Sequence, residues 1–382
     1  MDTDYIMPLN PQQDKGNKIQ SVNNVLNPQF EPLEAVKAYT SDRHILNDPK
    51  AFTDHVNSIM QSDENNDLFI AKTAMKWIEQ AKVRPVPKML FGQFWYEFEI
   101  SILFADTNLG KSILAVQIGN GISKGKSITG FKLEAEKQSI LYFDFELNDK
   151  QFESRYSVNY ERHYAFDDNF IRVEINPDAI IPEGKIFDEF LRDSIELYIR
   201  KTGAKILIID NLTYLSNETE KAKDALPLMK HLKALKNKYG LSILVIAHTP
   251  KRDLSKPITK NDLAGSKMLI NFTDSCFTIG ESASDKSLRY LKQIKVRQSE
   301  FVYDGENVCV CQLHKPHNFV EFEFLNYGSE REHLKVVTEK AKENQIVEAT
   351  ELRKQGKSLR EIGVQLGLSH MQVSRLLKNS KL

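Results

Sequence analysis

Residues 105–112, ADTNLGKS, have the residue types and spacing of a phosphate-binding loop. They follow the apolar run ISILF and open an amphipathic stretch, which gives the order strand, glycine-containing loop, helix. Loop amides and a helix N-terminus together form an anion site, where Lys111 is expected to reach the β- and γ-phosphates and Ser112 to ligate Mg²⁺. The alternative is an ordinary helix N-terminus with an exposed lysine. The residues predicted to bind the nucleotide are Ala105, Asp106, Thr107, Asn108, Leu109, Gly110, Lys111, Ser112 and Ile113.

The loop departs from the usual pattern G-x-x-x-x-G-K-[ST] at one position, because Ala105 replaces the first glycine.

A second segment of the predicted ATP site is ILIID at 206–210, four apolar residues that end in Asp210. A buried parallel strand of this kind delivers a carboxylate to the carboxyl edge of a sheet, where ligands bind in open α/β folds. Asp210 is therefore predicted to hold the Mg²⁺ shell through water, the alternative being a turn or N-cap aspartate.

The acid that activates water is sought in residues 140–156, ILYFDFELNDKQFESRY, a strand that runs into a helix. Asp144 and Glu146 both lie near the end of this strand, and a period of two places them on one face. Two more strands end in polar groups. Residues 241–251 contain His248 at a strand end, and residues 291–300 place Lys295 and Arg297 two apart on a strand. For His248, Lys295 and Arg297, the alternative to a functional role is a purely structural one.

The segment FELNDKQFESR resembles RecA-fold replicative helicases of the DnaB type, in which F-x-E-[ML]-[SN] is followed by Q-[LF]-x-x-R. The resemblance implies that Glu146 is the general base, with Gln151 and Arg155 at the expected offsets and Asp144 as the competitor. It also implies that His248 senses the γ-phosphate. The pair Lys295 and Arg297 matches a K-x-R motif that RecA-fold hexamers insert into the ATP site of a neighbouring subunit.

Five motifs follow one another over about residues 90–300: the phosphate loop, the catalytic acid, the strand that ends in Asp210, the strand that ends in His248, and the K-x-R pair. In this order they resemble RecA-fold P-loop ATPases similar to RepA-type hexameric helicases, and RepA-like AAA proteins of bacterial mobile elements. The resemblance implies ATP and Mg²⁺ as cofactors and a homo-oligomer, a hexameric ring. A replicative DNA helicase of a plasmid, phage or integrative element is the leading interpretation. A RecA-fold ATPase that regulates or loads another machine at DNA without unwinding it is the alternative.

Two regions are candidates for DNA contact. Residues 250–268 form a loop-like basic segment with a local charge of +3. The resemblance to RecA-fold hexamers implies that this segment faces single-stranded DNA in a central channel. The alternative is a basic surface loop that is only solvated. Its basic residues are Lys251, Arg252, Lys256, Lys260 and Lys267.

The second region is the tail, residues 345–382, which carries seven Lys/Arg and three acids. Its apolar spacing predicts three short helices in a helix-turn-helix, with the turn at LGLS and a capping box from Ser369 to Gln372. A protein-docking module is the alternative. The residues predicted to face duplex DNA are His370, Gln372, Ser374, Arg375 and Lys378.

Strands alternating with helices over about 90–280, followed by hairpins to 327, predict an α/β fold with a mostly parallel sheet covered on both faces. The expected organisation is a disordered segment 1–30, a helical region with linker 31–88, the ATPase domain 89–327, a linker 328–344 and the helix-turn-helix 345–382. Cys309, Cys311, His314 and His317 do not have a usual zinc spacing, so no metal is expected there.

The composition narrows the class of protein. Lys and Arg together number 52, as do Asp and Glu, so the formal charge is zero and any charge-driven binding must come from local patches. Three cysteines in 382 residues argue against a disulfide scaffold. The sequence shows neither a secretory signal nor a transmembrane stretch, so we expect a cytoplasmic protein without membrane contact.

Overall fold

A computed structural model describes Lys50 and residues 69–211, 222–249, 252–263, 266–336, 339–366 and 368–379. Within these ranges it leaves out the side chains of residues 222–226, 266–268, 339–344 and 378–379. The chain divides into two compact units, Met1–Pro85 and Val86–Leu382. The boundary falls near the end of the region 31–88 that was expected to contain a linker, at Pro85 and Pro87, two prolines that disfavour a helix. The segment 1–30, expected to be disordered, lies outside the described residues.

The second unit is built on a nine-stranded sheet with the order β13-β12-β11-β10-β3-β9-β8-β4-β7. The six strands from β10 to β7 are parallel, whereas β11, β12 and β13 add to β10 as antiparallel strands. Their bounds are β3 Ile100–Ala105, β4 Ile140–Asp144, β7 Phe170–Val173, β8 Ile206–Asp210, β9 Ser242–His248, β10 Ser275–Glu281, β11 Leu288–Lys295, β12 Val308–His314 and β13 Glu321–Gly328. This confirms the predicted mainly parallel sheet with hairpins at its end.

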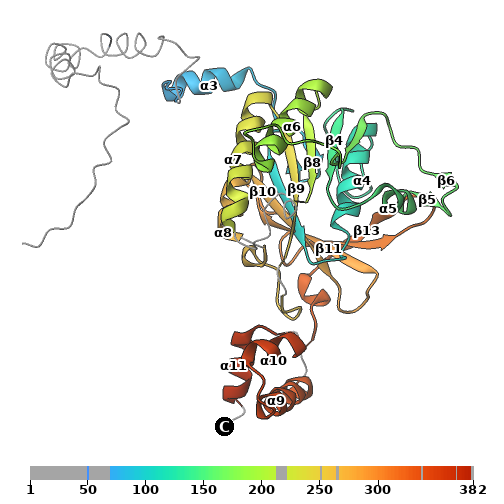
Figure 1. Cartoon of the computed structure of the whole chain (residues 1–382), viewed down its shortest axis with the longest axis vertical. Coiled ribbons are helices and arrows are strands. Elements are labelled where there is room, and N and C mark those ends of the chain that lie inside the picture. The colour runs from blue at the N-terminus through green and yellow to red at the C-terminus, as the bar shows by residue number, and fades with distance from the viewer. Residues whose placement is uncertain are drawn as a thin grey trace, which may run out of the picture. The chain divides into compact units, whose positions relative to one another are not determined.

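Helices cover both faces of this sheet, as Figure 1 shows. Helix α4 (Lys111–Lys124) packs on one face, where Leu114, Ile118 and Ile122 join a core with alternate residues of the central strands. The helices α6 (Phe187–Thr202), α7 (Ala222–Tyr239) and α8 (Ser266–Phe272) pack on the other face. Because both faces are buried, the central strands are continuous apolar runs, as expected for parallel strands.

Shorter elements connect these layers. They are β1 Met89–Phe91, β2 Trp95–Tyr96, α5 Asp149–Arg155, β5 Ser157–Val158, β6 Arg162–His163, η3 Lys260–Asp262 and η4 Glu330–His333. The Asn148 side chain and Gln151 form a capping box at the start of α5, which fixes where the chain leaves β4 and turns into a helix. Residues 301–303, part of the stretch expected to form hairpins up to residue 327, lie in an irregular connection between β11 and β12.

The first unit is described mainly by helix α3 (Ala74–Lys82), which Thr73 caps through its hydroxyl. A helix was expected here from the spacing of Met75, Trp77 and Ile78, and these three side chains are all exposed. Most of the expected helical region 31–81 lies outside the described residues. None of the described helices combines the length and the apolar character needed to cross a membrane.

The stretch 328–344, expected to be a linker, is partly folded onto the sheet. In η4, Glu330 is 1% exposed and accepts a hydrogen bond from the Ile258 amide at 2.7 Å. His333 stacks on Tyr290 and contacts Ser282. The prediction was wrong for this part because polar residues were interpreted as solvated, whereas their charges are paired with buried partners.

Three helices follow: α9 (Glu339–Lys354), α10 (Leu359–Leu366) and α11 (His370–Asn379). They share a small core that is separate from the two cores of the sheet. The core is made of Ala349, Ile362 and Val373, with Leu352, Leu359, Leu366, Leu368 and Leu377 packed against it. The three predicted helices are therefore present, although the first begins six residues earlier than expected. The turn residue Gly367 lies outside the described residues.

Candidate nucleotide-binding site

The phosphate loop follows β3, in which every residue is buried. Gly110 has a φ of 93° and begins α4, a conformation that L-amino acids rarely adopt. The Lys111 ammonium is buried and donates to the carbonyl oxygens of Ala105 at 3.1 Å and of Asp106 at 2.9 Å. Burial lowers the pKa of Lys111. A buried ammonium that is held by loop carbonyls is suited to binding a phosphate in the same loop.

Asp210 lies at the end of β8 beside this loop and is fully buried. The Tyr142 hydroxyl donates to its Oδ2 at 2.6 Å, while its Oδ1 has no hydrogen-bond partner among the described residues. Burial raises the pKa of Asp210 to about 6, although the nearby Ser112 hydroxyl and Tyr142 oppose this rise. An under-satisfied buried carboxylate next to a hydroxyl fits a hydrated Mg²⁺. Ser112 and Asp210 are therefore the residues that would hold the ion.

Glu146 and His248 meet at the same edge of the sheet. The His248 ring nitrogen Nε2 lies 3.4 Å from Glu146 Oε1. The contact with His248 lowers the pKa of Glu146, so the carboxylate is ionised at neutral pH. Asn211 lies between these side chains, since its amide nitrogen donates to Glu146 and lies 3.0 Å from His248 Nε2. An ionised, 40% exposed carboxylate beside a phosphate loop has the properties of a general base.

Asp144, the competitor of Glu146, is used differently. Its side chain is fully buried and pairs with Arg172 at 2.9 Å. It also accepts hydrogen bonds from the amides of Glu146 at 3.2 Å and Leu147 at 2.9 Å. These contacts shape the turn that presents Glu146. The geometry therefore favours Glu146 over Asp144 as the acid that activates water.

Strand β13 closes the phosphate loop from the side. A Cβ added at Gly110 would lie 2.9 Å from Cζ of Phe322, so that ring lies directly against the loop. The Gln117 side chain of α4 donates to the Phe322 carbonyl at 3.0 Å and accepts from its amide at 2.9 Å. The helix that carries the loop is thus fixed to β13 by a two-point contact.

Lys295 and Arg297 lie at the opposite edge of the sheet, and β11 ends at Lys295, so only the first of the pair is in the strand. Lys295 donates to the carbonyls of Ile270 and Thr273 at 2.5 and 2.6 Å. Arg297 is 49% exposed and pairs with Asp274 at 3.2 Å. Asp274 also accepts from the Ile100 amide at the start of β3, whereas the phosphate loop follows the end of β3. The structure therefore does not bring Arg297 to the phosphate loop of its own chain.

The basic segment is only partly described. Arg252 donates to the Lys256 carbonyl at 3.0 Å, and Lys256 pairs with Asp253 at 3.3 Å. The side chains of Lys256 and Lys260 are exposed. Lys251 and the side chain of Lys267 lie outside the described residues. The segment thus presents two exposed ammonium groups, and its anchor is the buried Ile258.

In the tail, the predicted capping box is present. The Ser369 hydroxyl accepts from the Gln372 amide at 3.3 Å, and the Gln372 side chain accepts from the Ser369 amide at 2.7 Å. Gln372 also donates to Asp253 at 2.7 Å. His370 and Arg375 are exposed, Ser374 is half-buried, and the Lys378 side chain lies outside the described residues.

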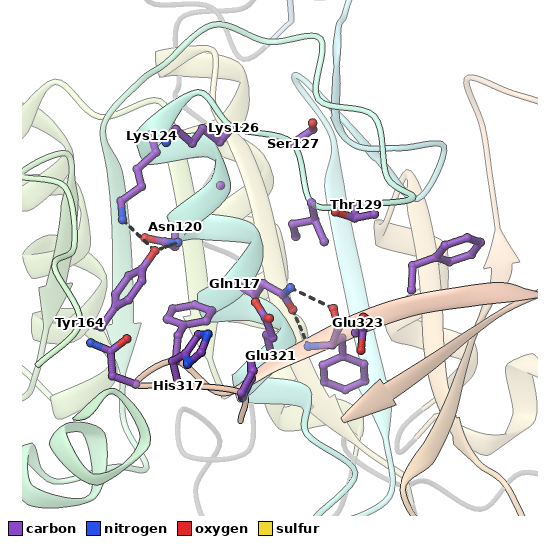
Figure 2. Close-up of a pocket in the computed structure, with 17 residues that line it drawn as sticks. Gln117, Asn120, Lys124, Lys126, Ser127, Thr129, Tyr164, His317, Glu321 and Glu323 are labelled. Carbon is purple, nitrogen blue, oxygen red and sulfur yellow. Dashed lines mark hydrogen bonds between the residues drawn. The ribbon is translucent and has the colours of Figure 1, made fainter. Parts of the chain in front are cut away.

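A cavity of about 510 Å³ lies along the carboxyl half of α4, away from the phosphate loop (Figure 2). At its wall, the Asn120 amide nitrogen donates to the Tyr164 hydroxyl at 2.9 Å, and Lys124 donates to the same hydroxyl at 2.7 Å. The close-up shows both contacts, together with that of Gln117. Cys309 and Cys311, which were considered as zinc ligands from the sequence, are buried core residues of β12.

Three residues of the nucleotide site were not anticipated from the sequence: Tyr142, Asn211 and Phe322. Tyr142 is two residues before Asp144 on the same face of β4, and strand alternation could have indicated it. Asn211 directly follows the strand-ending Asp210, which is a detectable signal. Phe322 is more than 200 positions from Gln117, and no local pattern indicates that contact.

We compared the chain with known protein families, curated proteins and solved structures. Residues 65–253 match the family model described as AAA domain, a little under half of the chain. One similar solved structure is a KaiC-like protein from the hyperthermophilic archaeon Pyrococcus horikoshii OT3. It is 12% identical, covers 60% of this chain and 90% of its own, and has a TM-score of 0.42. No curated protein matches the sequence.

The family match spans β3, the phosphate loop, β4 with Glu146, β8 with Asp210 and β9 with His248. These are the elements that meet at the carboxyl edge of the parallel sheet. The match and the geometry together support a P-loop ATPase domain in this chain, similar to the AAA domain family.

Proposed function

We propose that this protein is an ATP-driven motor that acts on DNA, a replicative helicase similar to the RepA type, working as a homo-oligomeric ring of six subunits. The proposal is supported most by one observation. Four groups converge at one sheet edge: the buried Lys111, the Ser112 hydroxyl, the under-satisfied Asp210 and the ionised Glu146. Arg297, the candidate arginine finger, lies at the other edge.

The proposed hydrolysis uses residues of the chain in distinct roles. Lys111 leaves its loop carbonyls and binds the β- and γ-phosphates. Ser112 and Asp210 would hold Mg²⁺, which would supply neutralisation of the phosphate charge. Glu146 accepts the proton of the attacking water, and His248 donates a hydrogen bond to the γ-phosphate.

The position of Arg297 supports an assembly. Five residue steps along β3 lead from Ile100 to Ala105, so at about 3.3 Å per step the strand end beside Asp274, the partner of Arg297, lies roughly 17 Å from the loop. An arginine finger must contact the transferred phosphate. As an arginine finger, Arg297 would act on the site of another copy, and its partial exposure fits that role.

Forked-duplex unwinding by the purified protein tests the motor. We expect ATP hydrolysis that single-stranded DNA stimulates, a mass corresponding to a hexamer, and strand separation that requires ATP. Unwinding should disappear in Glu146→Gln, which keeps the phosphate loop intact. Hydrolysis without any unwinding of forks with either polarity of tail would reject the helicase and leave the ATPase.

A DNA-binding regulator or loader that hydrolyses ATP without unwinding is the second candidate. The observation that favours it is the tail, because α9, α10 and α11 have a core of their own and end in the capped helix that carries Arg375. Such a module reads duplex DNA in helix-turn-helix proteins. Site-specific duplex binding with slow turnover would support this candidate.

Removal of residues 337–382 separates the tail from the motor. Since the two cores of the sheet do not include tail residues, hydrolysis and assembly should be retained. Duplex affinity should fall, and the loss should be larger at low salt because the tail carries positive charge. Arg375→Ala should cost about 1–3 kcal/mol of duplex binding if that side chain contacts a base edge. Unchanged duplex affinity with a collapsed ring would show that the tail is a docking element.

A further inference from the structure

Asn211 is the residue through which Glu146 and His248 are connected. Its side chain is 2% exposed and lies directly after Asp210. The amide nitrogen donates to Glu146 Oε1 and lies 3.0 Å from His248 Nε2. Glu146 and His248 themselves are separated by 3.4 Å between Oε1 and Nε2. The sequence pattern had assigned no role to this asparagine.

The sheet order explains why these three side chains meet. Strands β4, β8 and β9 are neighbours, with Asp144 paired to Asp210 and Ile209 paired to Val245. Glu146, Asn211 and His248 therefore come from the carboxyl ends of three adjacent strands, with the asparagine on the middle one. To reach the ring of His248, the carboxylate of Glu146 must lie across the end of β8.

The same order places the phosphate loop beyond β9. Strand β3 is the next neighbour, and its last residue, Ala105, pairs with His248. A contact that draws Glu146 from β4 across β8 therefore moves its carboxylate toward the loop. The other groups that attract the Glu146 carboxylate include the His248 ring, 3.4 Å away, and the positive charges of Lys111 and Arg155. Asn211 therefore adds a directional hydrogen bond to a longer contact and to attractions that do not fix a direction.

An asparagine is suited to this task because it does not titrate near neutral pH. It can donate to a carboxylate without accepting the proton that a general base must remove from water. Its contact with Nε2 is a hydrogen bond only when that nitrogen is unprotonated, whereas the ring donates to Glu146 only when Nε2 carries a proton. Asn211 and Glu146 thus share Nε2 of His248. The ring is hydrogen-bonded to Asn211 when this nitrogen is unprotonated and to Glu146 when it carries a proton.

We propose that Asn211 is a positioning residue for ATP hydrolysis, which holds the Glu146 carboxylate and the His248 ring together on the side of the phosphate loop. It acts through these two groups and not through contact with the nucleotide. The inference rests on the ATP hydrolysis proposed above, and it adds a residue that hydrolysis requires.

The test separates nucleotide binding from the chemical step. In Asn211→Ala, kcat should fall by about tenfold or more, the scale of one hydrogen bond to a charged group, while the KM for ATP stays within about twofold. Asn211→Asp keeps the shape but replaces the donor with a second carboxylate beside Glu146. It should lower kcat at least as far, because like charges repel. Affinity for a non-hydrolysable ATP analogue should be unchanged in both variants.

Asn120→Ala is the matched control. Asn120 is also a largely buried asparagine, 9% exposed, and it donates to Tyr164 beside the cavity in Figure 2, at the other end of α4. Its kcat should remain within twofold of the unmodified protein. A loss of kcat in Asn120→Ala equal to that in Asn211→Ala would mean that removing any buried amide slows the enzyme, and it would overturn the inference.

The remaining outcomes are also decisive. If the unmodified protein does not hydrolyse ATP, the proposed function fails before Asn211 is considered. If it does, and a folded Asn211→Ala or Asn211→Asp hydrolyses ATP at the normal kcat, the positioning role is wrong. A raised KM with normal kcat would instead place Asn211 in nucleotide binding and would also overturn it. Thermal melting identifies a misfolded variant, and the isosteric Asn211→Asp decides if Asn211→Ala does not fold.

Discussion

Two largely buried aspartates at opposite edges of the parallel sheet, Asp210 and Asp274, differ in how they are paired. At the carboxyl edge, Asp210 has an oxygen without a hydrogen-bond partner among the described residues. At the amino edge, Asp274 accepts from the Ile100 amide at 3.0 Å and from Lys236 at 2.9 Å, and it pairs with Arg297.

The pKa shifts follow this difference. Burial raises the pKa of Asp210 to about 6 despite its hydroxyl neighbours. Burial acts on Asp274 in the same direction, but the Ile100 amide, Lys236 and Arg297 outweigh it, so the pKa of Asp274 is lowered. The burial of Asp210 is thus not offset by its partners, whereas the burial of Asp274 is. Burial also raises the pKa of Glu99, which precedes β3 at the amino edge, to about 7, so the contrast concerns these two aspartates and not every charge at the two edges.

The largest effect should come from the carboxyl edge. Lys111→Ala should abolish ATP binding, since it removes the ammonium that the loop holds. Glu146→Gln should bind ATP and lose hydrolysis, because the phosphate loop is intact and only the base is gone. Equilibrium nucleotide binding measured beside turnover separates the two. Normal hydrolysis by Glu146→Gln with an inactive, folded Asp144→Asn would show that the base is misassigned.

A smaller but still large effect is expected at the amino edge. Arg297→Ala should lower turnover by roughly 10³-fold, by analogy with other arginine fingers. Mixing this variant with Lys111→Ala should restore part of the activity, because one intact interface can form between two defective subunits. The absence of rescue in assemblies that exchange subunits would contradict action on a neighbour and make the contrast between the edges purely structural.

Asp210→Asn should raise stability while it abolishes Mg²⁺-dependent hydrolysis. The folded pKa of Asp210 is about 6 and the ordinary value is 3.8, so the folded state binds the proton more tightly. Stability therefore falls as pH rises through this window, and the cost is complete above about pH 6. Melting without nucleotide at pH 7.5 should show a gain on the order of 2 kcal/mol, or roughly 2–4 °C. The gain should vanish near pH 4.

Asp274→Asn should show the opposite sign and the smallest effect. The pKa of Asp274 is lowered in the folded state, so its carboxylate stabilises the protein above its ordinary pKa and loses this contribution only in acid. The variant should lose about 1 kcal/mol at pH 7.5, since one ionic partner of Lys236 and Arg297 disappears. If Asp210→Asn and Asp274→Asn changed the stability in the same direction in matched melts, the distinction between the two aspartates would be wrong.

Sequence reasoning predicted the parallel sheet and the positions of Lys111, Asp210 and His248, because continuous apolar runs that end in polar residues are local patterns. It also predicted the capping box at Ser369. It could not choose between Asp144 and Glu146 without the resemblance, since alternation places both on one face. The decisive fact, the pairing of Asp144 with Arg172, depends on a strand 28 positions away.

The errors have a similar cause. Residues 328–344 are polar, and their interpretation as a linker failed because Glu330 is paired with Lys292 and Tyr290 of β11. Arg297 was placed on a strand that ends two residues earlier. Burial of a charge depends on partners far along the chain, and a single sequence contains no local signal for them.

The contact of Gln117 with Phe322 has a consequence for self-association. Strand β13 is the outermost strand on its side of the sheet, and an outer strand presents amides and carbonyls that can recruit a strand from another molecule. The Gln117 side chain occupies both backbone groups of Phe322 that point away from β12. A side chain thus takes the place of a missing neighbour, and this part of the sheet margin is protected against strand addition and the aggregation that follows from it.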